Sequence, residues 1–101
     1  MTRHDFESLD GRTVLITGGA GHIGSAAAEA FLALGARVVT ADVSGSHLTG
    51  ALKESDQIRH HIVDLADPTA SSGLVDLVID DFGRLDVVVA TASWMGTDST
   101  E

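Results

Sequence analysis

The feature that most constrains the fold is a glycine-rich segment between a predicted strand and a predicted helix. Thr13–Thr17 is a short apolar run rich in β-branched residues, and Gly18–Gly24 follows it as Gly-Gly-Ala-Gly-His-Ile-Gly. Apolar residues then recur at helical spacing, and Gly35 stands where a helix commonly ends. The predicted apolar stripe comprises Ile23, Ala26, Ala27, Ala30, Phe31 and Leu34. The segment therefore predicts the strand, turn and helix that open a βαβ unit.

The remaining chain repeats this alternation. Three further apolar runs predict strands, at Arg37–Asp42, Ile58–Val63 and Leu85–Ala90. Asp67-Pro68 predicts the start of a second helix, which Gly83 ends. Its predicted apolar face comprises Leu74, Val75, Val78 and Phe82. With right-handed crossovers, this order predicts a Rossmann-like, doubly wound α/β fold: a partial parallel sheet of about four strands in the order 3-2-1-4.

The chain is long enough for one small domain. Its 101 residues divide into a polar N-terminal arm, residues 1–10, and a partial Rossmann-like domain, residues 11–101. Ser44–Glu54 predicts a loop with a short helix around Leu48–Lys53, and Thr91–Glu101 predicts a second loop. We expect the fourth strand to form an apolar sheet edge through which the chain associates with itself, as a homo-oligomer or less specifically.

Composition excludes several classes of function. The sequence has six Lys and Arg residues and 15 Asp and Glu residues, which gives a formal charge of −9. This charge argues against nucleic-acid and anionic-membrane partners. The sequence has no cysteine, so disulfides and thiolate chemistry are excluded. No apolar run approaches the ~20 residues that span a bilayer. The polar start, Met1–Asp10, is unlike a secretory signal, so a cytoplasmic location is expected.

Several polar residues invite a functional reading that their spacing does not support. His60 and His61 are adjacent in a predicted strand, so they point to opposite faces and cannot reach one metal ion. A solvated or edge position is expected for both. Asp80 and Asp81 are predicted to lie on the solvated side of a helix. No metal ligand is therefore assigned.

The glycine-rich segment predicts a diphosphate site. Gly18 allows a tight turn out of the strand, Gly21 removes a side chain where backbone approaches a pyrophosphate, and Gly24 lets the helix pack close to the sheet. The first helical N–H groups and the helix dipole then face the diphosphate. The remaining candidate binding residues of this segment are Thr17, Gly19, His22 and Ile23. A glycine-rich turn without a ligand is the alternative.

Two aspartates predict how an adenosine would be recognised. Asp42 ends the second strand 18 residues after Gly24, close to the expected spacing for the acid that binds a ribose. Its carboxylate would repel a 2′-phosphate, so Asp42, with Val43 beside it, favours NAD over NADP. Asp64-Leu65 follows the third strand, where Asp64 could accept from the adenine amino group. The alternative for both aspartates is a turn residue.

Together these residues resemble the N-terminal half of a short-chain dehydrogenase/reductase. The resemblance extends from about Leu9 to Gly96 and includes the strand Leu85–Val89. It implies that Ala90, Thr91 and Ala92 line the cofactor. The family usually has Asn-Asn-Ala-Gly there, whereas this chain has Ala-Thr-Ala-Ser. The glycine spacing is commoner in the extended subfamily of sugar-nucleotide epimerases and dehydratases.

The resemblance also says which chemistry these residues cannot perform. The family uses a Tyr-x-x-x-Lys pair, a serine and an asparagine, but this sequence has neither tyrosine nor asparagine, and Lys53 precedes the third strand. No catalytic residue is predicted, and we expect a fragment or truncated product with only the NAD-binding half of an oxidoreductase. The alternatives are part of an NAD-dependent epimerase or dehydratase, a non-catalytic dinucleotide-binding module and, more distantly, a methyltransferase.

Overall fold

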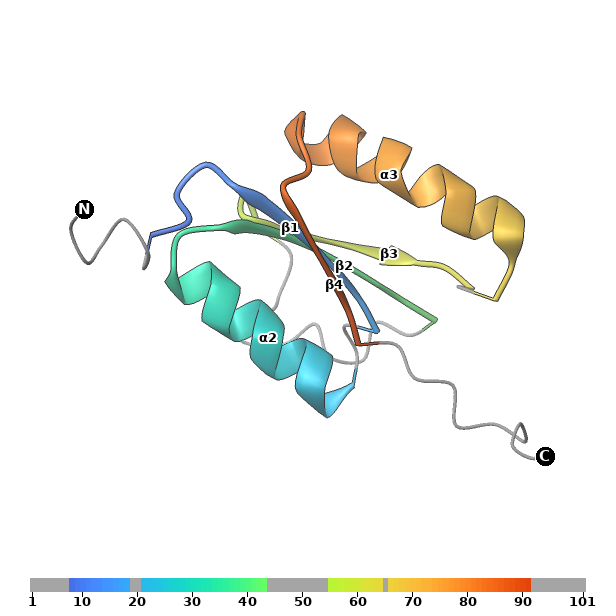
Figure 1. The fold of residues 1–101 in the computed structure, drawn as a ribbon, viewed down its shortest axis with the longest axis horizontal. Helices are drawn as coiled ribbons and strands as arrows, with labels where there is room; N and C mark the ends of the chain where they lie inside the picture. Colours follow the sequence, from blue (N-terminus) through green and yellow to red (C-terminus); the bar gives the residue numbers. More distant parts are fainter. Residues whose placement is uncertain (1–7, 19–20, 44–54, 65, 92–101) are drawn as a thin grey trace.

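A four-stranded parallel sheet forms the centre of the molecule, with one helix on each face (Figure 1). The computed structural model describes residues 8–18, 21–43, 55–64 and 66–91. The strands are β1 (Thr13–Thr17), β2 (Arg37–Asp42), β3 (Ile58–Ile62) and β4 (Val87–Ala90), and the helices are α2 (His22–Ala33) and α3 (Pro68–Phe82). The strand order β3-β2-β1-β4 confirms the predicted doubly wound arrangement.

The face covered by α2 is built on small side chains. Val14, Ile16, Val38 and Ile58 of the sheet are buried with Ala28 and Ala36. The predicted stripe of α2 is wrong in part, because Ile23 is 75% exposed and Ala26 and Ala30 are also exposed. Gly24 and Ala28 are buried instead, with Ala27, Phe31 and Leu32 packed beside the cluster. Close approach through glycine and alanine determines which face of this helix is buried.

The face covered by α3 contains the larger aliphatic side chains. Leu15, Val39 and Ala41 of the sheet pack against Leu74 and Val78 of α3. The predicted face is correct at Leu74, Val78 and Phe82, but Val75 is 49% exposed and Leu77 packs in its place.

Both predicted ends of α3 are confirmed. The Asp67 carboxylate accepts from Thr69 N at 2.9 Å, with Pro68 in the first helical position. Gly83 adopts a φ of +79° and donates its N–H to Ile79 O at 2.7 Å. The N-cap bond satisfies one of the first helical N–H groups, and the left-handed glycine lets the chain leave the helix toward β4.

The two histidines of β3 do point to opposite faces, as predicted, but neither is simply solvated. His60 Nδ1 lies 2.6 Å from Thr40 Oγ1 on the α2 face. His61 Nε2 lies 2.6 Å from Asp81 Oδ2 of α3, and both side chains of this pair are mostly buried. The prediction that Asp81 lies on a solvated face is therefore wrong, because His61 draws it onto the sheet.

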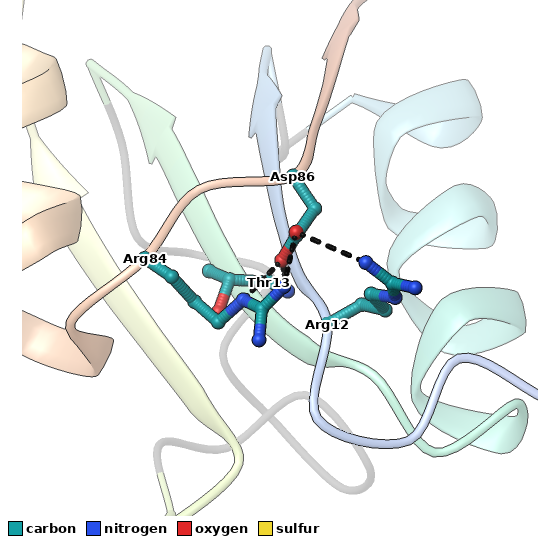
Figure 2. A network of polar contacts seen from close by, with 4 residues as sticks. All are labelled: Arg12, Thr13, Arg84 and Asp86. Carbon is teal, nitrogen blue, oxygen red and sulfur yellow. Dashed lines mark hydrogen bonds and ion pairs between the residues drawn. The ribbon is translucent and has the colours of Figure 1, made fainter.

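A carboxylate joins the start of β1 to the start of β4 (Figure 2). Asp86 Oδ2 accepts from Thr13 N at 2.8 Å and from Arg84 Nε at 2.9 Å. Asp86 Oδ1 accepts from Arg84 at 2.7 Å and from Arg12 at 3.5 Å. β4 begins at Val87, two residues later than predicted. Leu85 packs into the core on the α3 side instead, and the Asp86 side chain takes part in this hydrogen-bond network.

Replacing Asp86 with asparagine is expected to lower the free energy of unfolding at neutral pH. It is also expected to reduce the further decrease of this free energy as the pH falls. Bonds from Arg84 and Thr13 lower the pKa of Asp86 to about 2, and Asp86 in turn raises the pKa of Arg84. A lowered folded-state pKa stabilises the fold above the unfolded value, and that stabilisation is lost as pH falls toward 2. Acid titration followed by circular dichroism measures this. An unchanged acid transition in Asp86→Asn would contradict it.

Candidate functional site

The predicted site residues that the structure describes lie at the carboxyl ends of the strands or at the start of α2. After β1 the chain crosses to β2 through α2 on one face, and after β3 it crosses to β4 through α3 on the other. β1 and β4 therefore border the point at which the winding reverses, where open α/β sheets bind ligands. The start of α2, its light-blue end near the bottom centre of Figure 1, lies at this edge.

Gly18 makes the turn out of β1 by a conformation that favours glycine. Its φ is +78°, in the left-handed region. Its N–H donates to Ala41 O of β2 at 2.8 Å, and its carbonyl accepts from Gly21 N at 3.1 Å. These two bonds fix the turn to β2 and direct the chain into α2.

Neither the backbone angle of Gly21 nor its contacts with the described residues require a glycine at this position. Its φ is −79°, which any residue adopts, and among the described residues a Cβ there would meet only Gly18 O, at an ordinary 3.5 Å. Gly21 is the N-cap of α2, and among the described residues no side chain caps that helix and no acid lies in its first turn. A bare backbone and uncapped N–H groups at a helix start suit an anionic group that approaches closely.

The other members of the glycine-rich segment divide into packing and surface residues. Gly24 is buried where α2 meets the sheet, as predicted for close packing. His22 is exposed, and Ile23 is 75% exposed at the same helix start. The two side chains thus lie where a bound molecule could reach them, and neither belongs to the core.

Asp42 and Asp64 differ in their surroundings. Asp42 ends β2, is half-buried, and accepts from Val43 N at 2.6 Å through Oδ1. Val43 beside it is 64% exposed. Asp64 is exposed, its Oδ1 accepts from Ala66 N at 3.0 Å, and its carbonyl accepts from Asp67 N at 3.0 Å. Asp64 thus forms the turn that leads into α3, whatever else it binds.

Thr91 ties the end of β4 to the glycine-rich turn. Its hydroxyl donates to Thr17 O at 2.7 Å and lies 3.2 Å from Gly18 O, while its N–H donates to Thr17 O at 3.0 Å. Sequence reasoning placed Thr91 in the site but missed this role. The available signal was a hydroxyl at the strand end, where the resemblance expects an asparagine.

Replacing Thr91 with valine is expected to cost about 1 kcal/mol of stability, because the hydroxyl bond is lost and two carbonyls lose a donor. For a chain of this size, that lowers the melting temperature by roughly 4–8 °C. Thr91→Ser keeps the hydroxyl and serves as the control. Differential scanning calorimetry compares the three proteins, and an equal loss in both variants would contradict a role for the hydroxyl.

Some predicted residues lie outside the described part of the chain. They are Gly19, Leu65 and Ala92 of the site, the short helix at Leu48–Lys53, and the loop beyond Thr91. Ala90, which is described, is exposed at the end of β4 and pairs with Thr17 of β1. In the parts that the structure describes, no helix is long and apolar enough to cross a membrane.

The strand order and the glycine turn between β1 and α2 define a doubly wound α/β protein, and the comparisons identify its family. The family described as short chain dehydrogenase matches residues 12–101. A short chain dehydrogenase/reductase, dpmpG of Macrophomina phaseolina, is 39% identical over 93 residues, which cover 87% of this chain and 53% of that protein. The chain belongs to the short-chain dehydrogenase/reductase family.

Solved structures of family members agree in fold. A glucose/ribitol dehydrogenase-type member from Brucella melitensis superposes with a TM-score of 0.72 at 30% identity, over 81% of this chain and 35% of that one. A 3-ketoacyl-(acyl-carrier-protein) reductase of the same organism, complexed with NADH, gives 0.71 at 26% identity, over 80% of this chain and 34% of that one. The chain therefore spans about half or less of the relatives' lengths.

Proposed function

We propose that this chain forms the NAD-binding portion of a short-chain oxidoreductase, which transfers a hydride between nicotinamide and an alcohol or carbonyl compound. The observation that carries the proposal is Gly21 at the start of α2: neither its backbone angle nor its contacts with the described residues require a glycine, and no described side chain caps the helix there. A ligand that needs bare backbone supplies the missing reason.

Each residue has a defined task in this proposal. The first N–H groups of α2 would hold the pyrophosphate, with the turn fixed by Gly18 and by the Thr91 hydroxyl. Asp42 would accept hydrogen bonds from the ribose hydroxyls, and the exposed Val43 would lie beside the adenine. Bound nicotinamide supplies or accepts the hydride, and the proton donor that the family uses, a tyrosine, is absent from these 101 residues.

Charge supports NAD over NADP. The Asp42 carboxylate stands at the end of β2, and a 2′-phosphate on the ribose would meet it directly. The described arginines lie elsewhere, near the amino ends of the strands, as Arg12, Arg37, Arg59 and Arg84. Without a guanidinium from the described residues to neutralise it, a phosphate beside Asp42 is repelled.

The proteins with similar folds support the reaction class. The Brucella dehydrogenase is named for glucose, a sugar, and ribitol, a sugar alcohol, and the Brucella reductase was solved with NADH. The epimerase alternative rests on glycine spacing alone, and a match to the short chain dehydrogenase family gives it no support. We therefore place the substrate among alcohols and carbonyl compounds.

Titration of the chain with NADH, followed by nicotinamide fluorescence, tests the proposal. Saturable enhancement that excess NAD reverses is expected, with weaker binding of NADPH. The methyltransferase alternative predicts instead a calorimetric response to S-adenosylmethionine and none to NADH. Absence of NADH binding by a chain that circular dichroism shows to be folded would contradict the proposal.

A further inference from the structure

The hydroxyl of Thr91 completes the hydrogen bonding of two carbonyl oxygens at the glycine-rich turn. Its single proton is shared between Thr17 O at 2.7 Å and Gly18 O at 3.2 Å. Thr17 O also accepts from Thr91 N at 3.0 Å, and Gly18 O also accepts from Gly21 N at 3.1 Å. A carbonyl oxygen has two lone pairs, so each of these oxygens has a donor for both of them.

One of these oxygens borders the surface that the proposed ligand would approach. A Cβ built on Gly21 would meet Gly18 O at 3.5 Å, so this oxygen lies beside the bare backbone at the start of α2. A diphosphate that approaches Gly21 would therefore have Gly18 O as a near neighbour. Because a carbonyl oxygen carries a partial negative charge, a lone pair without a donor at this place would repel the ligand.

Thr13 shows that a threonine hydroxyl in this sheet does not always have such a task. It stands at the amino end of β1, at the opposite edge of the sheet from Thr91. Its side chain is buried, and its Oγ1 has no hydrogen-bond partner among the described residues. The two bonds of the Thr91 hydroxyl are thus a specific feature of the glycine-rich turn.

We propose that Thr91 is a positioning residue for the diphosphate of the bound dinucleotide, an inference that rests on the proposed function. Its hydroxyl draws the carbonyl oxygens of Thr17 and Gly18 toward β4, so that the N–H groups of α2 face the ligand. Through Gly18 O it also steadies Gly21, whose N–H donates to the same oxygen. Thr91 thus raises the affinity for a diphosphate by acting through the turn.

Fluorescence titration of the unchanged chain and two variants with NADH tests this inference. Thr91→Val keeps the shape of the side chain and removes its hydroxyl, and NADH should bind roughly three- to tenfold more weakly. Thr91→Ser keeps the donor and should restore most of the affinity. Competition against NADH separates the parts of the ligand: ADP-ribose, which has the diphosphate, should lose the same factor, and adenosine, which lacks it, should lose none.

Thr13→Val is the matched control, because it removes a hydroxyl that has no partner among the described residues and should leave the NADH affinity unchanged. Circular dichroism verifies that each variant is folded, and Thr91→Ala replaces Thr91→Val if the valine variant is not. A measurement without cofactor completes the test. Amide hydrogen exchange at Gly21 should be faster in Thr91→Val than in the unchanged chain.

The possible failures of this inference and of the proposed function can be told apart. Equal NADH affinities in Thr91→Val and the unchanged chain, or an equal loss in Thr91→Ser, would overturn the inference and leave the proposed function intact. An equal loss of adenosine affinity would also overturn it, because the effect would not act on the diphosphate. Absence of NADH binding by the folded, unchanged chain would overturn the proposed function and this inference with it.

Discussion

Replacing Asp42 with alanine should weaken NAD binding by roughly 10- to 100-fold, because hydrogen bonds to a charged group contribute about 1.5–3 kcal/mol each. The same change removes the negative charge that opposes a 2′-phosphate, so NADPH binding should hold or improve. The preference for NAD over NADP should therefore narrow or vanish. Fluorescence titration with both reduced cofactors measures both effects.

Asp80→Ala is the matched control for this prediction. Asp80 is an exposed carboxylate on α3, well separated in the fold from the carboxyl end of β2. Its replacement changes the net charge by the same amount and should leave both affinities unaltered. If Asp42→Ala and Asp80→Ala give the same small change, Asp42 acts only through the overall charge and does not bind the ribose.

Replacing Gly21 with alanine should abolish tight NAD binding while leaving stability nearly unchanged. The added methyl group would stand where the pyrophosphate approaches the N–H groups of α2, and loss of one charged hydrogen bond alone costs roughly 10- to 100-fold in affinity. In the described part of the protein the methyl group meets only Gly18 O, at 3.5 Å. The poorer N-cap and the stiffer unfolded chain have opposite effects, each of about 0.5–1 kcal/mol.

Gly83→Ala should show the converse behaviour. Gly83 has a φ of +79°, and no described residue lies within 4 Å of a Cβ added there, so alanine would suffer backbone strain without a clash against these residues. The expected cost is about 1–2 kcal/mol of stability, with NAD affinity retained in the folded protein. Calorimetry and NADH titration of both variants test whether Gly21→Ala changes only the NAD affinity and Gly83→Ala only the stability. Equal NAD affinities in Gly21→Ala and the unchanged chain would remove the main support for the proposed function.

Local backbone preferences decide one part of this fold, and contacts between distant segments decide the rest. Alternating strands and helices with right-handed crossovers allow few topologies, and the predicted order β3-β2-β1-β4 is the observed one. The helix ends at Asp67, Pro68 and Gly83 could be predicted from the sequence because caps act through neighbouring backbone groups. The same holds for Gly18, whose positive φ belongs to the turn itself.

The buried face of α2 could not be predicted in the same way. The helix is rich in alanine, so several rotations offer a similar apolar stripe, and the sequence pattern favoured one that leaves Ile23 in solvent. Gly24 and Ala28 decided the rotation because they allow the closest approach to the sheet. Which face of a helix is buried depends also on the surface against which the helix packs, so the sequence of the helix alone does not determine it.

Contacts between residues far apart in the sequence were likewise decided only by the tertiary structure. His61 and Asp81 meet because β3 lies under α3, and Asp86 reaches Thr13 because β4 lies beside β1. Thr91 reaches the carbonyls of Thr17 and Gly18 for the same reason. The sequence by itself determined the order of elements, their caps and the glycine-rich turn, since those depend on local backbone preferences. The polar ties between elements depend on which strands become neighbours.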